Sequence, residues 1–241
     1  MSAPRALLLD ALGTLVELEP PVEPLRRELR ERCGLELSAA EAGAALRAEI
    51  AFYRAHHDDA SDRERLVDLR RRATEALRDA LPPAARDVSR AVLTEALLAA
   101  LRFRPFAEVP EVLGAARERG VRLVVVSNWD VSLHDVLEDT GLAPLLDGVV
   151  TSAEVGSAKP QGAIFARGLA LAGVAAGEAL HVGDSVEHDV TGALAAGIVP
   201  MLVVRDGAAP DAPVPSGVRT ITTLRPLLDV LGATRSVSLD A

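Results

Sequence analysis

The hydrophobic and polar positions of the chain follow two different patterns. Residues 5–9 form a short apolar run that ends at Asp10 and is followed by Gly13 and Thr14, which predicts a buried strand running into a turn. From about Pro20 to Arg104, apolar residues recur at helical spacing in a stretch rich in Ala, Leu, Arg and Glu. This stretch predicts four helices and no strands.

Helix starts inside this helical stretch are marked by local sequence patterns. Ser38 precedes Glu41 by three residues, and Ser61 precedes Glu64 by three residues, which is the spacing of a capping box. The proline pair at 82–83 predicts a break before the next helix. We therefore expect helices to begin just after Ser38 and Ser61.

After Pro105 the chain alternates between short apolar runs and helical segments. The predicted strands are 121–127, 147–152, 179–184, 199–204 and, as a short last strand, 219–221. The predicted helices are near 131–140, 160–172 and 188–196. This alternation predicts an α/β fold, a Rossmann-like parallel sheet with helices on both faces.

The helical stretch separates the first predicted strand from all the others. We therefore expect two units, an α/β core made of residues 1–16 and 105–241, and an all-helical cap made of residues 17–104 that is inserted after the first strand. The chain shows no internal repeat and no low-complexity tract.

Composition excludes several classes of protein. The 241 residues carry a formal net charge of −9, whereas a nucleic-acid-binding surface needs clustered Lys and Arg. Cys33 is the only cysteine, which excludes an internal disulfide and a cysteine metal cluster. No apolar stretch approaches the roughly 20 residues that span a bilayer, and the N-terminal run makes a poor signal peptide. We therefore expect a cytoplasmic protein with neither nucleic acid nor membrane as partner.

Polar residues stand at or just past the ends of the predicted strands. In an open parallel sheet, ligands bind outside these carboxyl ends. The residues at these positions are Asp10, Ser127, Asn128, Lys159, Asp184, Ser185 and Asp189. We expect the side chains of this set to converge on one site that the helical cap covers.

Each of these residue types suits one chemical task. The Asp10 carboxylate can attack phosphorus or an activated carbon and form a covalent intermediate. Lys159, the only lysine in the chain, can neutralise charge that develops on phosphoryl oxygens, to which Thr14 and Ser127 can donate hydrogen bonds. Asp10 and Asp184 can share Mg²⁺, which prefers oxygen ligands. The pattern favours a magnesium-dependent hydrolase.

Four segments, in order, resemble the motifs of the haloacid dehalogenase superfamily of hydrolases. They are LLLDALGTL, VVVSN, the isolated lysine in SAKPQ, and HVGDSVEHD. The resemblance spans the whole chain and implies subfamily I of that superfamily, with a helical cap inserted after the first strand. The segments SNWD, AEVGSAKP and ALHVGDS further resemble the branch named for a rhythmically expressed fly gene.

The resemblance also implies roles for individual residues. The implied catalytic residues are Asp10, as nucleophile, and Lys159. The residues implied to bind the phosphoryl group are Thr14, Ser127, Asn128 and Lys159. The implied Mg²⁺ ligands are Asp10, the backbone carbonyl of Leu12, and Asp184, with Asp189 as a supporting carboxylate. The implied substrate is a small phosphorylated metabolite.

Leu12 is the position at which the chain departs from the family pattern. Phosphatases of the family usually carry a second aspartate there, which transfers a proton to the leaving group. Leucine cannot do this, and losing a general acid–base group costs typically about 10²–10⁴-fold in rate. His56 and His57 in the cap are candidates to supply the proton instead. We interpret His181 as a strand residue satisfied by packing and His188 as a surface residue.

Three further alternatives follow from Leu12. The 2-haloacid dehalogenases of the family also lack the second aspartate, but they work without metal, whereas GDSVEHD keeps the metal-site carboxylates. Phosphonate-cleaving relatives need a lysine in the cap, and this cap has none. A non-catalytic binding protein would not need Asp10. We therefore predict a slow phosphatase of small phosphate monoesters, with the dehalogenase and the binding protein as alternatives.

Overall fold

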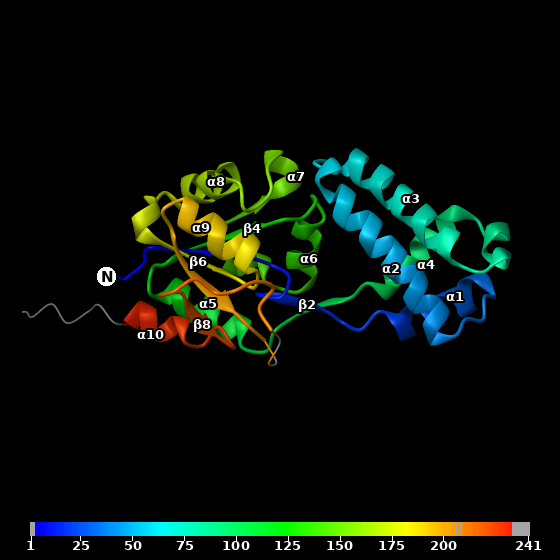
Figure 1. The fold of residues 1–241 in the computed structure, drawn as a ribbon, viewed down its shortest axis with the longest axis horizontal. Coiled ribbons are helices and arrows are strands. Elements are labelled where there is room, and N and C mark those ends of the chain that lie inside the picture. Colours follow the sequence, from blue (N-terminus) through cyan, green and yellow to red (C-terminus); the bar gives the residue numbers. More distant parts are fainter. Residues whose placement is uncertain (1–2, 206, 208, 233–241) are drawn as a thin grey trace, which may run out of the picture.

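The computed structural model, which describes residues 3–205, 207 and 209–232, contains a six-stranded sheet in which all neighbouring strands run parallel (Figure 1). The strand order is β5-β4-β1-β6-β7-β8. The strands are β1 (Ala6–Leu9), β4 (Arg122–Ser127), β5 (Gly148–Thr151), β6 (Ala179–Gly183), β7 (Val199–Val203) and β8 (Arg219–Ile221). The predicted Rossmann-like parallel sheet is confirmed, and β1 lies in its middle. Residues 233–241 of the predicted core lie outside the described residues.

Helices cover both faces of the sheet because side chains alternate along each strand. Leu7 and Leu9 of β1 belong to a hydrophobic cluster shared with three helices on one face, and Ala6 and Leu8 belong to a cluster on the other face. The helices of the first face are α5 (Val109–Glu118), α6 (Leu133–Asp139) and α10 (Leu227–Gly232). The helices of the second face are α8 (Gly162–Ala172) and α9 (Thr191–Ala195).

Residues 22–100 form a bundle of four α-helices beside the sheet, with no strand among them (Figure 1). The helices are α1 (Val22–Cys33), α2 (Ala39–His56), α3 (Arg63–Ala80) and α4 (Arg90–Ala100), with 3-10 turns η1 (His57–Asp59) and η2 (Pro83–Asp87). Buried leucines such as Leu25, Leu46, Leu77 and Leu93 form a hydrophobic core of their own inside this bundle. Throughout the described part of the chain, no helix combines the length and the apolar character that crossing a membrane requires.

The starts of α2 and α3 show how local side chains set the helix boundaries. The Ser38 hydroxyl accepts a hydrogen bond from the Glu41 amide, and the Glu41 carboxylate accepts one from the Ser38 amide, so the predicted capping box is confirmed. The start predicted from Ser61 is wrong by one residue. Asp62 is the N-cap of α3, because its carboxylate accepts from the Arg65 amide.

A short antiparallel ribbon joins the helical bundle to the core, and the sequence did not predict it. β2 (Val16–Leu18) pairs with β3 (Phe103–Pro105), so residues 103 and 104, predicted to be non-strand, lie in a strand. Glu17 pairs with Arg104 across the ribbon, and their side chains form an ion pair at 2.9 Å. Strands of three residues are too short to show a period in the sequence. The two connections between core and bundle therefore run side by side.

Candidate active site

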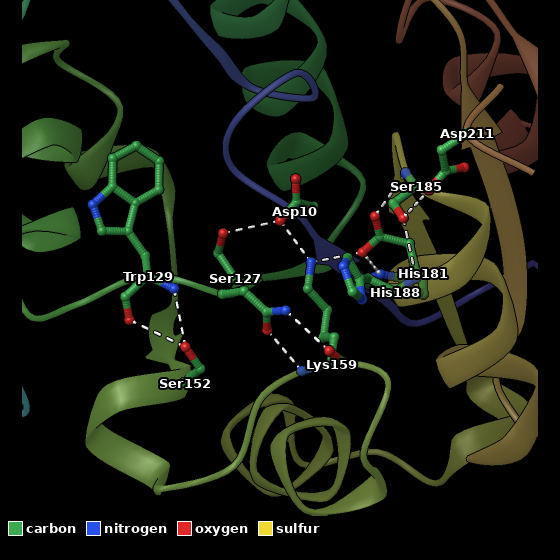
Figure 2. Close-up of polar contacts among 11 residues, drawn as sticks. Asp10, Ser127, Trp129, Ser152, Lys159, His181, Ser185, His188 and Asp211 are labelled. Carbon is green, nitrogen blue, oxygen red and sulfur yellow. Dashed lines mark hydrogen bonds and ion pairs between the residues drawn. The ribbon is translucent and has the colours of Figure 1, made fainter. Parts of the chain in front are cut away.

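Side chains from separate strand ends meet at the carboxyl edge of the sheet. Asp10 follows β1, Ser127 ends β4, Asp184 follows β6, and Lys159 lies in the loop before α8. The Ser127 hydroxyl donates a hydrogen bond to Asp10 Oδ1 at 2.9 Å, and Lys159 Nζ donates to the same oxygen at 2.6 Å (Figure 2). The structure thus brings together the residues whose strand-end positions predicted one site, while their chemical roles stay predictions.

Lys159 lies buried between two carboxylates. Its Nζ donates to Asp189 Oδ1 at 2.6 Å as well as to Asp10, and only 3% of the residue is exposed. Burial opposes the charged form of the lysine, but the Asp10 and Asp189 carboxylates outweigh it and raise the pKa of Lys159. Burial likewise opposes ionisation of Asp189, yet Lys159 and His181 hold the pKa of that carboxyl well below its usual range. Lys159 is therefore held as an ammonium.

Asp10, Asp184 and Asp189 form a set of acidic oxygens that, with Lys159, we call the carboxylate cluster. One oxygen from each aspartate lies within 4.8 Å of the others. Loss of solvent and the charges of Asp10 and Asp189 raise the pKa of Asp184 to about 7. Burial raises the pKa of Asp10 in the same direction, although Lys159 and Ser127 oppose it. Because crowded carboxylates resist ionising together and Mg²⁺ prefers such oxygens, this donor set fits Mg²⁺.

Two glycines allow the cluster to be this compact. Gly13 has φ +78°, and a Cβ at that position would lie 2.1 Å from Asp184 Oδ2. A Cβ on Gly183 would lie 2.1 Å from the Asp189 carboxylate carbon. The backbone that follows β1 therefore packs directly against Asp184, which only glycine permits. Because Gly13 and Gly183 have no side chain, the loop after Asp10 and the carboxylates after β6 can lie in direct contact.

Asn128 and Thr14 were predicted to bind the phosphoryl group, and those roles stay predictions. The Asn128 amide nitrogen donates to the Lys159 carbonyl at 3.0 Å, and its amide oxygen accepts from the Lys159 amide at 2.7 Å. Asn128 therefore fixes the backbone of the lysine. The Thr14 hydroxyl is buried and has no hydrogen-bond partner among the described residues, so the structure does not bring it into the network.

Asp189 is held by three donors, which makes it a supporting residue of the cluster. Its Oδ1 accepts from Lys159 and from His181 Nε2 at 2.8 Å, and its Oδ2 accepts from the Ser185 amide at 3.0 Å. His181 is fully buried with its ring edge on Phe165. The interpretation of His181 as a packed strand residue is confirmed, and the ring also hydrogen-bonds Asp189, which the sequence did not predict.

Comparison with known proteins places these features in a family. Residues 4–197 match the haloacid dehalogenase-like hydrolases. The chain belongs to this family. Both the parallel sheet and the order of the strand-end residues agree with the resemblance seen in the sequence.

Two curated relatives are similar in sequence to part of the chain. Haloacid dehalogenase-like hydrolase domain-containing protein 3 of Bos taurus is 40% identical over 124 residues, 49% of each chain. Phosphoserine phosphatase of Thermus thermophilus is 36% identical over 142 residues, 58% of this chain and 55% of its own. The chain thus spans about half the length of the curated relatives it matches.

A solved structure shows that the fold extends to a different reaction. The 2-haloacid dehalogenase of Pseudomonas syringae superposes with a TM-score of 0.66 at 23% identity, covering 95% of this chain and 99% of that one. At this identity the likeness shows the fold alone. The fold of the family therefore does not separate phosphatases from dehalogenases, and residues of the site must do so.

Leu12 stands where the resemblance in the sequence implies a second aspartate in phosphatases of the family. The residue is 41% exposed, although most leucines of the core are fully buried. Its backbone forms a bridge with Val16, which closes the turn after Asp10. Leu12 therefore faces open space and is not packed into the core.

The open space beside Leu12 is a cavity of about 660 Å³ between the helical bundle and the core, which we call the cap cavity. Cap helices α2, α3 and α4 line one side, and the loop after β4, with Asn128 and Trp129, lines the other. Leu12 follows Asp10 by two residues and Asn128 hydrogen-bonds the Lys159 backbone, so the cavity lies next to the loops that carry the carboxylate cluster. That the helical bundle covers the site stays a prediction.

Polar contacts hold the tip of the bundle to the core. The Tyr53 hydroxyl donates to Asp130 Oδ2 at 2.8 Å, and the Val131 amide donates to the Ala60 carbonyl at 3.1 Å. The Ser152 hydroxyl donates to Asp58 and lies against the Trp129 backbone, from which it accepts at 3.1 Å (Figure 2). The bundle therefore contacts the core at this tip.

The two cap histidines are placed differently with respect to the cavity. His57 lines the cap cavity, whereas His56 stacks on the Phe52 ring at 4.1 Å between centroids and points its Nδ1 at the Phe52 carbonyl. His188, interpreted as a surface residue, is exposed. Only His57 of these three thus borders the space beside Leu12.

Arg205, which the sequence analysis did not single out, braces the loop after Asp10. Its guanidinium donates to the Gly13 carbonyl at 3.1 Å, to the Thr14 carbonyl at 2.6 Å and to Glu108 at 2.8 Å. It also lies 3.5 Å over the Phe106 ring. The only signal in the sequence is an arginine just past the strand VPMLVV. Arg205 fixes the turn that carries Leu12.

Proposed function

We propose that the protein is a phosphatase that hydrolyses phosphate monoesters, with Asp10 as nucleophile and Mg²⁺ held at the carboxylate cluster. The observation that carries the proposal is the convergence of three carboxylates around one buried lysine, with Asp184 retained. A relative named phosphoserine phosphatase supports the reaction class. The substrate would be a small phosphorylated metabolite.

The hydrogen bonds leave one oxygen of Asp10 for the reaction. Ser127 and Lys159 both donate to Oδ1, and Oδ2 accepts no side-chain hydrogen bond among the described residues. Oδ2 is thus the oxygen that would attack phosphorus. Asp184, the most exposed of the three carboxylates, faces the same space. When bound, Mg²⁺ would supply positive charge to the phosphoryl oxygens and offset the repulsion between the carboxylates.

The reaction would proceed in two steps. Asp10 Oδ2 forms a bond to phosphorus while the bond between phosphorus and the ester oxygen breaks, and the departing alkoxide takes a proton from water, which leaves a hydroxide. A second water then attacks the phosphorus of the aspartyl phosphate, its released proton neutralises the hydroxide, and inorganic phosphate leaves as the Asp10 carboxylate is restored. Lys159 stays an ammonium throughout and neutralises charge beside the reacting oxygens. Because Leu12 transfers no proton, alcohols that leave easily should react fastest.

The second candidate is a 2-haloacid dehalogenase, which the apolar Leu12 side chain favours. A halide leaves without a proton, so a leucine at this position would cost that reaction nothing. Asp10 Oδ2 would then attack carbon instead of phosphorus. Against this, Asp184 would have no ion to bind if the enzyme worked without metal.

One assay separates the candidates. The purified protein is offered p-nitrophenyl phosphate, alkyl phosphates and 2-chloropropionate, each with Mg²⁺ and each with EDTA. We expect phosphate release that needs Mg²⁺ and is lost in Asp10→Asn. Chloride release that persists in EDTA would select the dehalogenase, and no release from any compound would favour the binding protein.

Metal binding is tested separately by unfolding. A ligand that binds only the folded state at 100 times its Kd stabilises it by about 2.7 kcal/mol. We expect Mg²⁺ to give a shift of this order in the wild type and in Glu187→Ala, which removes an exposed carboxylate outside the cluster. Asp184→Ala should lose most of the shift. Equal shifts in all three proteins would mean that Mg²⁺ binds elsewhere.

A further inference from the structure

The cap cavity has more room than a phosphate group needs. Its volume of about 660 Å³ falls within the roughly 300–1,000 Å³ of pockets that enclose whole organic ligands. Much of its lining is hydrophobic, and the bulkiest contributors come from both the cap and the core. They include Leu12, Tyr53, Leu66, Leu97, Leu98 and Trp129.

Hydrophobic side chains that reach water are uncommon on this protein, and two of them border this cavity. The large hydrophobic residues that are exposed in the described part of the chain are Leu12, Val67, Leu98 and Leu194. Leu12 and Leu98 line the cap cavity from opposite sides, one from the loop after β1 and the other from α4. Apolar surface presented into a concave space is a place for an apolar ligand.

Three polar side chains of the lining already form hydrogen bonds inside the protein. Asn128 holds the Lys159 backbone. Asp130 accepts from the Tyr53 hydroxyl and from the Ser132 amide, and the Thr94 hydroxyl donates to the Arg90 carbonyl. A sugar would need partners for each of its hydroxyl groups, since an unpaired buried hydroxyl costs free energy. Asn128, Asp130 and Thr94 are therefore poor partners for the hydroxyl groups of a sugar.

Other charged side chains also line the cavity. Arg54, Arg102 and Asp139 are exposed, so their charges stay in water, whereas Arg70 and Asp135 are half-buried. Glu49 lines the cavity and is only 5% exposed. No hydrogen bond of its carboxyl group is found among the described residues, and burial raises its pKa to about 7. Among the buried polar side chains of the lining, Asp130 is thus hydrogen-bonded, whereas Glu49 faces mainly apolar neighbours.

We propose that the cap cavity binds the alcohol part of the substrate and that this part is a large, mainly apolar group, so that the substrate is a phosphate monoester of an apolar alcohol. This rests on the proposed phosphatase function. A phosphoryl group at Asp10 places its ester oxygen beside Leu12, and the organic group then extends between Leu98 and the loop after β4. Leu12 forms the apolar floor of the binding site.

A homologous series of substrates tests the proposal. The kcat/KM values of ethyl, butyl, hexyl and octyl phosphate are measured with Mg²⁺, because the leaving alcohols differ little in acidity and the chemical step stays constant. Each added methylene that enters an apolar site should raise kcat/KM by about fourfold until the cavity is filled. Hexyl phosphate should also exceed glucose 6-phosphate, which has the same number of carbons but carries hydroxyl groups.

Two matched variants locate the effect. Leu98→Gln places a polar group in the cavity lining and should flatten the dependence on chain length. Val67→Gln makes the same kind of change at an exposed position of α3 that does not line the cavity, and it should keep the wild-type dependence. Glutamine suits a helix, so both variants should fold.

The outcomes separate this proposal from the proposed function. Two outcomes would overturn the apolar site and leave the phosphatase in place. In the first, kcat/KM is equal for ethyl and octyl phosphate. In the second, the dependence of kcat/KM on chain length falls equally in Leu98→Gln and Val67→Gln. If no ester is hydrolysed, binding of ethyl- to octylphosphonate is measured by calorimetry. Affinity that grows with chain length would then support the cavity without the phosphatase, and affinity independent of length would overturn it.

Discussion

The cap cavity lies next to the loops that carry the carboxylate cluster, yet the cavity and the cluster are built in opposite ways. In the cluster, Asp10, Lys159 and Asp189 are buried and each is paired with another member. In the cavity, polar side chains such as Asn128 turn to partners elsewhere in the protein, and apolar side chains such as Leu98 are left facing the space. We therefore expect the cluster to select the charge of the substrate, and the cavity to select the size and polarity of its organic group.

The difference follows from which elements supply each region. Cluster residues lie at the ends of parallel strands. Because backbone hydrogen bonds fix the spacing of these strands, few other contacts are needed to set the geometry of the cluster. The cavity is lined by side chains of long helices that only a few polar contacts, such as Tyr53 with Asp130, hold to the core. We expect substitutions in the cluster to change chemistry and stability, and substitutions in the cavity to change substrate choice.

The largest effect should come from Leu12, where the two regions meet. Leu12→Asp would supply the missing proton-transfer group, and alkyl phosphates should react up to about 10²–10⁴-fold faster. The gain for p-nitrophenyl phosphate should be much smaller, because its leaving group needs no proton. Since Leu12 is 41% exposed, the new carboxylate would keep its water and the fold should remain stable.

Leu12→Asn is the matched control for this change, because it is isosteric with aspartate but transfers no proton. Steady-state kinetics and thermal unfolding are measured on the same preparations. A stable, Mg²⁺-binding Leu12→Asp protein with no gain on alkyl phosphates would show that acid–base chemistry does not limit the enzyme. The dehalogenase and the binding protein would then be favoured.

The next effect concerns the stability of the cluster. Lys159→Met removes the only positive side chain between Asp10 and Asp189, and stranding a buried charge typically costs about 3–5 kcal/mol. We expect urea unfolding to show a loss of this size. Adding Asp189→Asn should restore part of it, because the second change removes one of the stranded charges. If the double variant were as unstable as the single one, the contact between Lys159 and Asp189 would not be what matters.

On the cavity side, the pH dependence of stability should reveal Glu49. Burial raises its pKa in the folded protein to about 7 from an unfolded value near 4.5. The folded state therefore keeps the proton that the unfolded state has lost, and stability falls as pH rises from 4.5 to 7. Glu49→Gln removes this group. The free energy of unfolding of the variant minus that of the wild type should therefore be larger at pH 8 than at pH 5, by at most about 3 kcal/mol.

Chemical denaturation of both proteins at pH 5 and pH 8 measures this difference. Subtracting wild type from variant removes the contributions of groups that both proteins share, including Asp184. A difference that stays constant between the two pH values would mean that the Glu49 carboxyl ionises as freely in the folded protein as in the unfolded one.

The strands and the strand-end residues could be predicted because each leaves a local signal. The apolar runs at 121–127 and 179–184 mark buried strands within a few residues, and Asp10 stands directly after another. Parallel pairing then places their ends together whatever the details of the loops. This is why Asp10, Ser127, Lys159 and Asp184 could be grouped before their distances were known.

Contacts between distant residues left no such signal. Arg205 braces Gly13 from 192 positions away, and the Tyr53 hydroxyl meets Asp130 from 77 positions away. The sequence also could not show that the Asn128 amide is used up on Lys159, since that depends on where two loops cross. The three-residue strands of the ribbon were missed for a different reason. In the sequence, Glu17 and Arg104 look like the polar ends of neighbouring segments, so the pattern predicts no strand there.

A smaller effect should follow from loosening the cap. Tyr53→Phe leaves Asp130, which is 1% exposed, without the donor to its Oδ2, at a cost of about 1–3 kcal/mol. Because the contact joins α2 to the core, we expect the preference for octyl over ethyl phosphate to fall while stabilisation by Mg²⁺ stays unchanged. Loss of both responses together would show that the cap contact also shapes the cluster.

The smallest effect should come from a second contact between cap and core, the ion pair of Arg63 with Asp135. Its side chains are 61% and 38% exposed, and exposed pairs gain little because water screens them and the side chains lose freedom on pairing. Arg63→Gln should therefore match the wild type in urea unfolding and keep its preference for long alkyl phosphates. If Arg63→Gln lost as much of the preference for octyl phosphate as Tyr53→Phe, the contact between cap and core would depend on how many contacts are made. Burial of the Tyr53 contact would then give it no special weight.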